Sequence, residues 1–233
     1  MPTFKKESAG DATVWTLRNT KGNELKITDR GARITAMRFR DKDFTNRFVF
    51  KDDAASAVKV DGGNDFADIV WSAEQLIEGL KLSAEVNGKS VSVIYSLSND
   101  NEISIKFEST GANDVSVSPI FSADALPEVK FRSGQKGAAW EAFADEKTYP
   151  VTEPAEVEME LGMFGYDPGC PIDYLDAGLK NGAFVFSEGA SIELIVYSTQ
   201  DELHAKAVDG GFTVGTCGAS KAQVVYMLKN RKS

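Results

Sequence analysis

Apolar and polar residues alternate with a period of two over much of the chain. The alternation is clearest in residues 90–97 and 103–108, where every second position is apolar (Val91, Val93, Tyr95, Leu97, Ile103, Ile105 and Phe107). Successive side chains of a β-strand point to opposite faces of a sheet, so this pattern predicts strands with one buried face.

Short turn signals separate these predicted strands. Asn87 and Gly88 lie between residues 80–86 and 90–97, and both tolerate the positive φ angles of a two-residue hairpin turn. A polar cluster follows at 98–101, so residues 76–109 are predicted to form a three-stranded meander. The same reasoning predicts a hairpin of residues 14–19 and 24–28, and strands at 34–39, 183–187, 191–198, 203–208 and 223–228.

Many short, regularly spaced strands are typical of a β-sandwich or barrel. We therefore predict an all-β fold with a large antiparallel β-sandwich, formed by residues 1–233 as a single domain. Residues 52–57 can form one helical turn. Prolines at 150, 154, 168 and 171 mark a loop-rich stretch that we interpret as a long crossing connection.

Composition and charge narrow the function. The apolar and charged fractions, 42% and 26%, are ordinary for a globular protein. The net charge of −9 disfavours nucleic acid and anionic membranes as partners, and we expect no membrane span. The two cysteines, Cys170 and Cys217, fit no metal-ligand spacing and make no disulfide framework. We therefore expect a cytoplasmic protein with no metal site and no cofactor.

Three ordered segments resemble the aldose 1-epimerase (galactose mutarotase) family. Residues 14–37 contain two strands and the step Gly31-Ala32-Arg33-Ile34-Thr35, which is similar to the opening of these proteins. Residues 60–71 resemble the family's His-Gly-Gly…Gly-Phe-Asp…Val-Trp segment, and residues 95–105 resemble its Tyr-x-Leu hairpin. The resemblance covers about the first half of the chain and implies a large β-sandwich with a sugar cleft on its concave face.

The resemblance also implies a mechanism whose residues are missing from this chain. Mutarotation needs a general base for the anomeric hydroxyl and a general acid for the ring oxygen, and the family uses a glutamate and a histidine. The family's first histidine falls on Asp61, its acid histidine near residues 117–122, and its glutamate near 215–218, where no acid stands. The segment that carries the family's arginine is shortened between Phe50 and Val60.

Two residues are candidates for a replaced acid–base pair. His204 is the chain's one histidine, and an imidazole titrates near neutral pH. Asp61 precedes Gly62-Gly63, so its carboxylate can act on a sugar hydroxyl, or the segment can simply be a turn. For His204, the alternative is a strand residue without a catalytic role.

Three further residues are candidates for substrate binding. Asp173, in the segment Ile172-Asp173-Tyr174, corresponds by resemblance to a sugar-binding aspartate, with a polar loop as the alternative. Trp71 and Trp140 can stack on the apolar face of a sugar, although core packing is the simpler interpretation of both, and more so of Trp71.

Three functional hypotheses follow from these observations. The first is an aldose 1-epimerase-like protein that binds a sugar or sugar phosphate without the usual mutarotase mechanism. The second is an active epimerase, an isomerase that acts on a hexose or hexose phosphate through substituted acid–base residues. The third is a structural or interaction domain whose cleft is filled or apolar. A shared fold does not choose between them.

Overall fold

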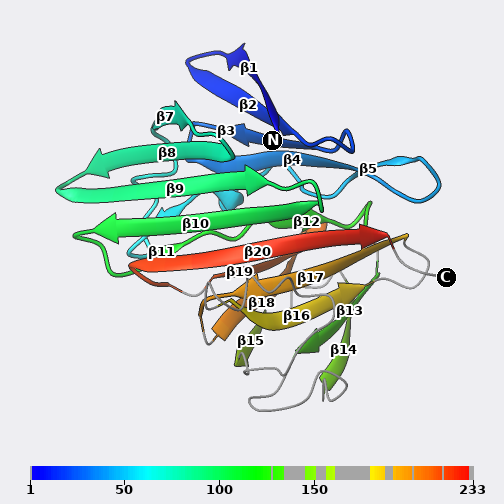
Figure 1. Cartoon of the computed structure of the whole chain (residues 1–233). Coiled ribbons are helices and arrows are strands. Elements are labelled where there is room, and N and C mark those ends of the chain that lie inside the picture. Colours follow the sequence, from blue (N-terminus) through cyan, green and yellow to red (C-terminus); the bar gives the residue numbers. More distant parts are fainter. Residues whose placement is uncertain are drawn as a thin grey trace.

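The computed structural model describes residues 2–126, 128–133, 145–150, 156–160, 179–186, 191–200, 202–216 and 218–230. Within these ranges the chain is built from antiparallel β-strands (Figure 1), which confirms the predicted all-β sandwich. The one helical element described is the 3-10 turn η1 (Ala54–Ser56), inside the predicted turn at 52–57 and capped by the Asp53 carboxylate. No helix in the described residues is therefore long enough to cross a membrane.

The N-terminal residues form a five-stranded sheet in sequence order. Its strands are β1 (Thr3–Ala9), β2 (Ala12–Arg18), β3 (Glu24–Thr28), β4 (Arg33–Arg40) and β5 (Asn46–Phe48). β2 and β3 form the predicted hairpin, and β4 contains the predicted strand at 34–39. β5 is the outermost strand on one side of this sheet.

A nine-stranded sheet crosses the whole molecule, and its order is β14-β13-β16-β17-β20-β10-β9-β8-β7. The meander consists of β7 (Ser72–Gln75), β8 (Gly79–Val86), β9 (Lys89–Leu97) and β10 (Glu102–Thr110). The remaining strands are β13 (Glu128–Ser133), β14 (Asp145–Pro150), β16 (Lys180–Phe186), β17 (Ile192–Ser198) and β20 (Lys221–Asn230). The predicted three-stranded meander is confirmed, and β7 is an additional edge strand.

Two smaller sheets complete the described part of the chain. β6 (Lys59–Val60) pairs with β11 (Val115–Ser116), and a four-stranded sheet has the order β12-β19-β18-β15. Its strands are β12 (Ile120–Ser122), β15 (Glu156–Glu160), β18 (Glu202–Val208) and β19 (Gly211–Thr216). β15 falls within the predicted crossing connection, of which residues 151–155 and 161–171 lie outside the described residues.

The main core lies between the nine-stranded sheet and the two sheets that face it. Buried residues come from the five-stranded sheet (Leu17, Leu25, Met37), the nine-stranded sheet (Val93, Ile105, Val224) and the four-stranded sheet (Val214). Two buried tyrosines connect these layers: the Tyr95 hydroxyl donates to the Ala32 carbonyl, and the Tyr226 hydroxyl donates to the Val214 carbonyl at 2.5 Å. Burial raises the pKa of both phenols, so both stay protonated donors.

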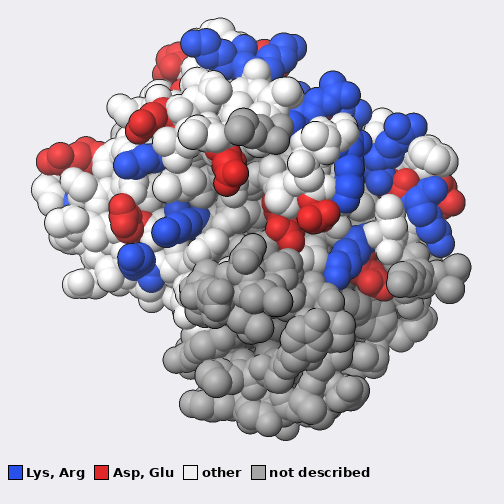
Figure 2. Space-filling model, viewed as in Figure 1, with Lys and Arg blue, Asp and Glu red and all other residues white. Residues whose placement is uncertain are grey.

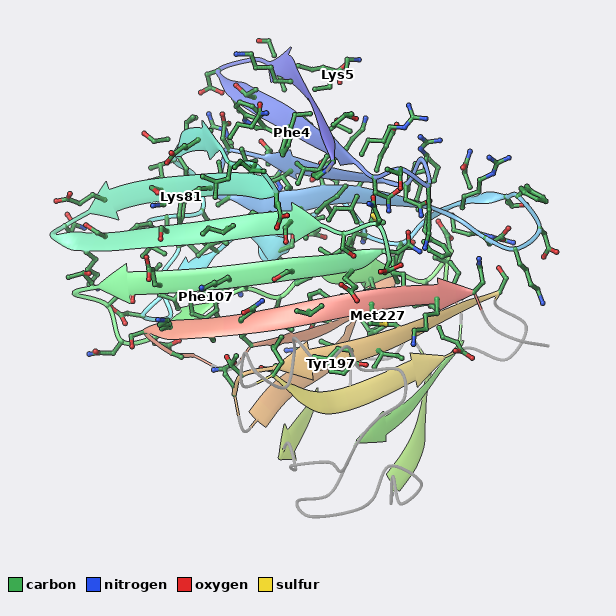
Figure 3. All side chains as sticks on the ribbon, viewed as in Figure 1. Phe4, Lys5, Lys81, Phe107, Tyr197 and Met227 are labelled. Atoms are coloured by element: carbon green, nitrogen blue, oxygen red, sulfur yellow. The ribbon has the colours of Figure 1, made fainter. Side chains whose placement is uncertain are left out.

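The opposite face of the nine-stranded sheet, here called the outer face, changes character along the sheet. On β17 and β20 it carries most of a second apolar cluster (Ile195, Tyr197, Val225 and Met227), which Leu179, just before β16, completes. Figure 3 labels Tyr197 and Met227 on these adjacent strands. On β8, β9 and β10 the same face is polar, because the residues between the core positions are mostly serine, lysine and glutamate. This polar part of the outer face therefore offers hydrogen-bonding groups to a ligand.

Candidate functional site

A groove with a volume of about 890 Å³ runs across one end of the nine-stranded sheet. It crosses β7, β8, β9, β10 and the start of β20, where the meander and the returning strand lie side by side (Figure 1). Ligand pockets in proteins commonly have volumes of about 300–1,000 Å³. The groove, here called the serine-lined groove, is therefore large enough for a small sugar.

Strand register aligns the floor of the groove. Ser83 pairs with Ser92, Ser92 with Glu108, and Glu108 with Lys221, so one row of polar residues crosses β8, β9, β10 and β20. The next residues along these strands, Leu82, Val93, Phe107 and Ala222, are buried in the core. Because side chains alternate between faces, the polar row lies on the outer face.

The groove is rich in hydroxyl groups. Ser72, Ser83, Ser90, Ser92, Ser109, Thr110 and Ser220 line it, together with Glu85, Glu108 and Lys221 and the apolar residues Ile69, Val70, Ala84 and Val91. Each hydroxyl both donates and accepts hydrogen bonds, and a carboxylate accepts strong hydrogen bonds from ligand hydroxyls. With two carboxylates and one ammonium, the lining suits a neutral polyol better than a phosphate.

Asp61 lies outside the groove lining, in a turn that its carboxylate stabilises. Asp61 and Gly62 have φ angles of 48° and 70°, as a two-residue turn between Val60 and Gly63 requires. Its carboxylate forms a 2.7 Å ion pair with Lys89 and accepts hydrogen bonds from the backbone N–H groups of Asp114 (3.0 Å) and Asn113 (3.2 Å).

These contacts decide the protonation state of Asp61. The Lys89 ammonium and then the Asp114 and Asn113 amides hold the pKa of this carboxyl below its usual range, although desolvation opposes them. Near neutral pH the group is a weakly basic carboxylate that is already occupied. The contacts therefore support the turn interpretation of Asp61.

Trp71 is part of the core. Its side chain is 2% exposed, its ring packs against Phe66 with the centroids 5.7 Å apart, and its indole N–H donates to the Phe66 carbonyl at 3.0 Å. A ring buried in this way has no free face for a sugar, so core packing, the simpler of the two interpretations, is the one that the structure supports. Trp140 and Asp173 lie outside the described residues.

His204 lies in the middle of β18, between two neighbouring strands. Its backbone pairs with Glu158 of β15 on one side and with Gly215 of β19 on the other. Glu158 was not predicted as a site residue, because nothing local in the sequence indicates that its strand pairs with residues 202–206. The strand register brings an imidazole-bearing and a carboxylate-bearing residue to paired positions.

The two segments where the resemblance places the family's acid and base are neighbours in this fold. The Val117 N–H donates to the hydroxyl of Thr216 at 3.0 Å, and Thr216 is buried. A Cβ atom on Gly215 would lie 2.1 Å from the Ser118 hydroxyl oxygen, so these backbones are in close contact. The two segments meet, and the polar side chains of their described residues are those of serine and threonine, which do not titrate near neutral pH; Cys217 lies outside the described residues.

The serine-lined groove was not predicted as a site, although its signal was present. The serines at alternate positions of residues 90–96 indicate a strand, and no more than that was predicted from them. The alignment of Glu108 with Lys221 depends on pairing between residues more than 100 positions apart, which no local pattern reveals. Among the described residues, no group of His, Cys, Asp and Glu side chains is arranged to hold a metal ion.

Solved structures provide the informative comparison. The chain is similar to a GalM/aldose epimerase homologue from C. elegans, with a TM-score of 0.61, 11% identity and 100% of both chains covered. It is also similar to galactose 1-epimerase from Lactobacillus acidophilus NCFM (TM-score 0.58, 13% identity, 100% of this chain and 99% of that one). A third similar structure is a putative mutarotase from Salmonella typhimurium (TM-score 0.57, 8% identity, 98% of this chain and 94% of that one). No family model and no curated protein matches the sequence.

Proposed function

We propose, on the premise that this chain has the galactose mutarotase-like fold, that it binds a neutral sugar without the usual mutarotase chemistry. The observation that carries the proposal is the serine-lined groove, in which Ser83, Ser92, Glu108 and Lys221 form one polar row on the outer face of paired strands. Hydroxyl-rich ligands are recognised by such mixed donors and acceptors, and the strands hold these groups at fixed spacings. A cleft that is filled or entirely apolar, as expected for a purely structural domain, does not fit this open groove of mixed polar and apolar lining.

The composition of the neighbouring segments supports the absence of mutarotase chemistry. General acid–base catalysis needs groups with pKa values near the working pH. Residues 117–122 and 215–218 contain no aspartate, glutamate or histidine, and Thr216 is buried with its hydroxyl already bonded to the Val117 backbone. Binding without ring opening is the function that these positions favour.

The test is isothermal titration calorimetry with glucose, galactose and their 6-phosphates. We expect a free sugar to bind more tightly than its phosphate, since Glu85 and Glu108 repel a phosphate. Glu108→Gln should weaken the binding about fivefold, because a hydrogen bond to a charged acceptor exceeds a neutral one by roughly 1 kcal/mol.

Glu102→Gln is the matched control for this variant. Glu102 lies on the same strand and the same face as Glu108, but outside the groove lining. Its substitution should leave the affinity unchanged. Absence of heat with every sugar would contradict sugar binding. Equal losses of affinity in Glu108→Gln and Glu102→Gln would show that the sugar does not bind in the groove.

An active epimerase with substituted groups is a second candidate, favoured by one observation. The register of β15, β18 and β19 aligns Glu158, His204 and Gly215. An imidazole and a carboxylate can serve as the general acid and general base that anomer exchange requires. This candidate predicts accelerated anomer exchange that His204→Ala abolishes, whereas binding alone predicts no acceleration.

A further inference from the structure

Exposed apolar side chains gather on two segments. Within the described residues, four large apolar side chains are exposed: Phe44 (75%), Phe48 (60%), Val70 (43%) and Ile77 (73%). Phe44 and Phe48 belong to the β4–β5 hairpin, and Val70 and Ile77 flank β7. Isolated exposed apolar residues need no explanation, but pairs of them on short segments indicate contact surfaces.

The β4–β5 hairpin combines its aromatic residues with basic ones. Register pairs Phe48 with Arg38, and the Arg40 guanidinium lies 4.9 Å from the centroid of the Phe44 ring. Lys42 adds a further positive charge at the tip. We call Arg38, Arg40, Lys42, Phe44 and Phe48 the basic patch. Arg38 forms a 2.7 Å ion pair with Glu24, so the charges that can pair with a second copy are those of Arg40 and Lys42. Figure 2 shows Lys and Arg, with acidic residues among them, on the side of the molecule where this hairpin lies.

The tip of this hairpin is held in a strained conformation. Phe44 has a φ of 61°, which is unfavourable for a bulky aromatic residue. The Phe44 N–H donates to the Asp41 carbonyl at 3.0 Å, and the buried Asp41 carboxylate accepts from the N–H groups of Asp43 (3.0 Å) and Thr45 (2.8 Å). A rigid turn that displays an aromatic ring under strain is typical of a contact site.

The second segment has the opposite charge. Residues 61–79 contain five acidic residues and no lysine or arginine. Glu74 and Glu78 are exposed, and Glu78 adjoins Ile77. Glu74 is opposite Lys81 of β8 in the strand register, but neither glutamate forms an ion pair among the described residues. We call Val70, Glu74, Ile77 and Glu78 the acidic patch.

We propose that the basic patch of one copy of this chain binds the acidic patch of a second copy. Each patch has two exposed apolar side chains, so contact buries apolar surface while it pairs Arg40 and Lys42 with Glu74 and Glu78. Both patches include the outermost strand of a sheet, β5 or β7, which allows close approach. The patches lie on opposite sides of the molecule (Figure 1), so the contact joins copies head to tail.

Charge reversal in each patch, followed by mixing, tests this proposal. Sedimentation velocity of the whole protein at increasing concentration should give a mass above the monomer mass of 25.3 kDa, and salt should lower it. The variants Arg40→Glu/Lys42→Glu and Glu74→Lys/Glu78→Lys should each stay monomeric, because like charges then face each other. An equal mixture of the two should associate again, since every contact in it has opposite charges.

Lys59→Glu/Lys106→Glu is the matched control. It changes the net charge by the same amount as Arg40→Glu/Lys42→Glu, at exposed residues outside both patches. It should associate like the natural chain. A natural chain that is monomeric at all concentrations would overturn the proposal, as would a mixture that remains monomeric. Equal loss of association in the control would mean that net charge, not patch contact, controls the mass.

Discussion

At the scale of single residues, alternation predicts which side chains are buried but not what the other side chains do. Val91, Val93 and Phe107 were expected in the core and are there. Glu108 alternates with them, so the sequence predicts only that its side chain points away from the core. Its place in the groove depends on neighbours from other strands. Asp61 shows the same limit: its position before two glycines allowed either a turn or a site, and only its contacts favour the turn.

Asp41 gives a residue-scale prediction of pH dependence. Burial alone would raise its pKa, but hydrogen bonds from Arg47, the Thr45 amide, the Ser191 hydroxyl and the Asp43 amide lower it to about 2. Because the folded pKa is below the unfolded value, the group stabilises the fold above pH 4 and this contribution is lost as the pH falls towards 2. The contribution is about 2 kcal/mol.

Urea denaturation from pH 7 to pH 3 measures this contribution. Asp41→Asn should lower the free energy of unfolding most at neutral pH, and its difference from the natural chain should shrink as the pH falls. Asp43→Asn, in the same turn but exposed, should show little difference at any pH. If the difference in the free energy of unfolding between Asp41→Asn and the natural chain did not change with pH, the lowered pKa of Asp41 would be contradicted.

At the scale of elements, the sequence predicts strands that have regular alternation and clear turns. The β2–β3 and β8–β9 hairpins and strand β4 were predicted for this reason. β7 was missed because all four of its residues are exposed and show no alternation. β6 and β11 have only two residues each, too few for a period to be visible.

The β8–β9 turn gives a prediction at this scale. Gly88 has a φ of 74°, and a Cβ atom built there would meet nothing within 4 Å. Gly88→Ala should therefore lower the free energy of unfolding through backbone strain alone, by about 1–2 kcal/mol. Chemical denaturation monitored by circular dichroism measures the change.

Gly63→Ala is the control for this substitution. Gly63 does not have a positive φ, and its Cβ atom would be in ordinary contact, 3.4 Å from the Val60 carbonyl oxygen. This variant should stay within about 0.5 kcal/mol of the natural chain. Equal stability of the two variants would show that the turn conformation is not what Gly88 provides.

At the scale of the whole molecule, the fold was predictable and the site only in part. Three ordered segments indicated the mutarotase-like sandwich, and the solved structures confirm it at the level of the fold. The strand order, with β20 between β10 and β17, depends on long-range pairing and could not be derived locally. A single domain over residues 1–233, Asp173 and Trp140 as sugar contacts, and a cytoplasmic location stay predictions.

The most direct test of the account is proton NMR on freshly dissolved α-galactose and α-glucose with and without the protein. One sample reports both sugar binding, by saturation transfer from protein to sugar, and the rate of anomer exchange. The account predicts saturation transfer to at least one sugar and an exchange rate equal to that in buffer. Accelerated exchange would contradict it and direct attention to His204 and Glu158. Absence of saturation transfer to either sugar would contradict sugar binding in the groove.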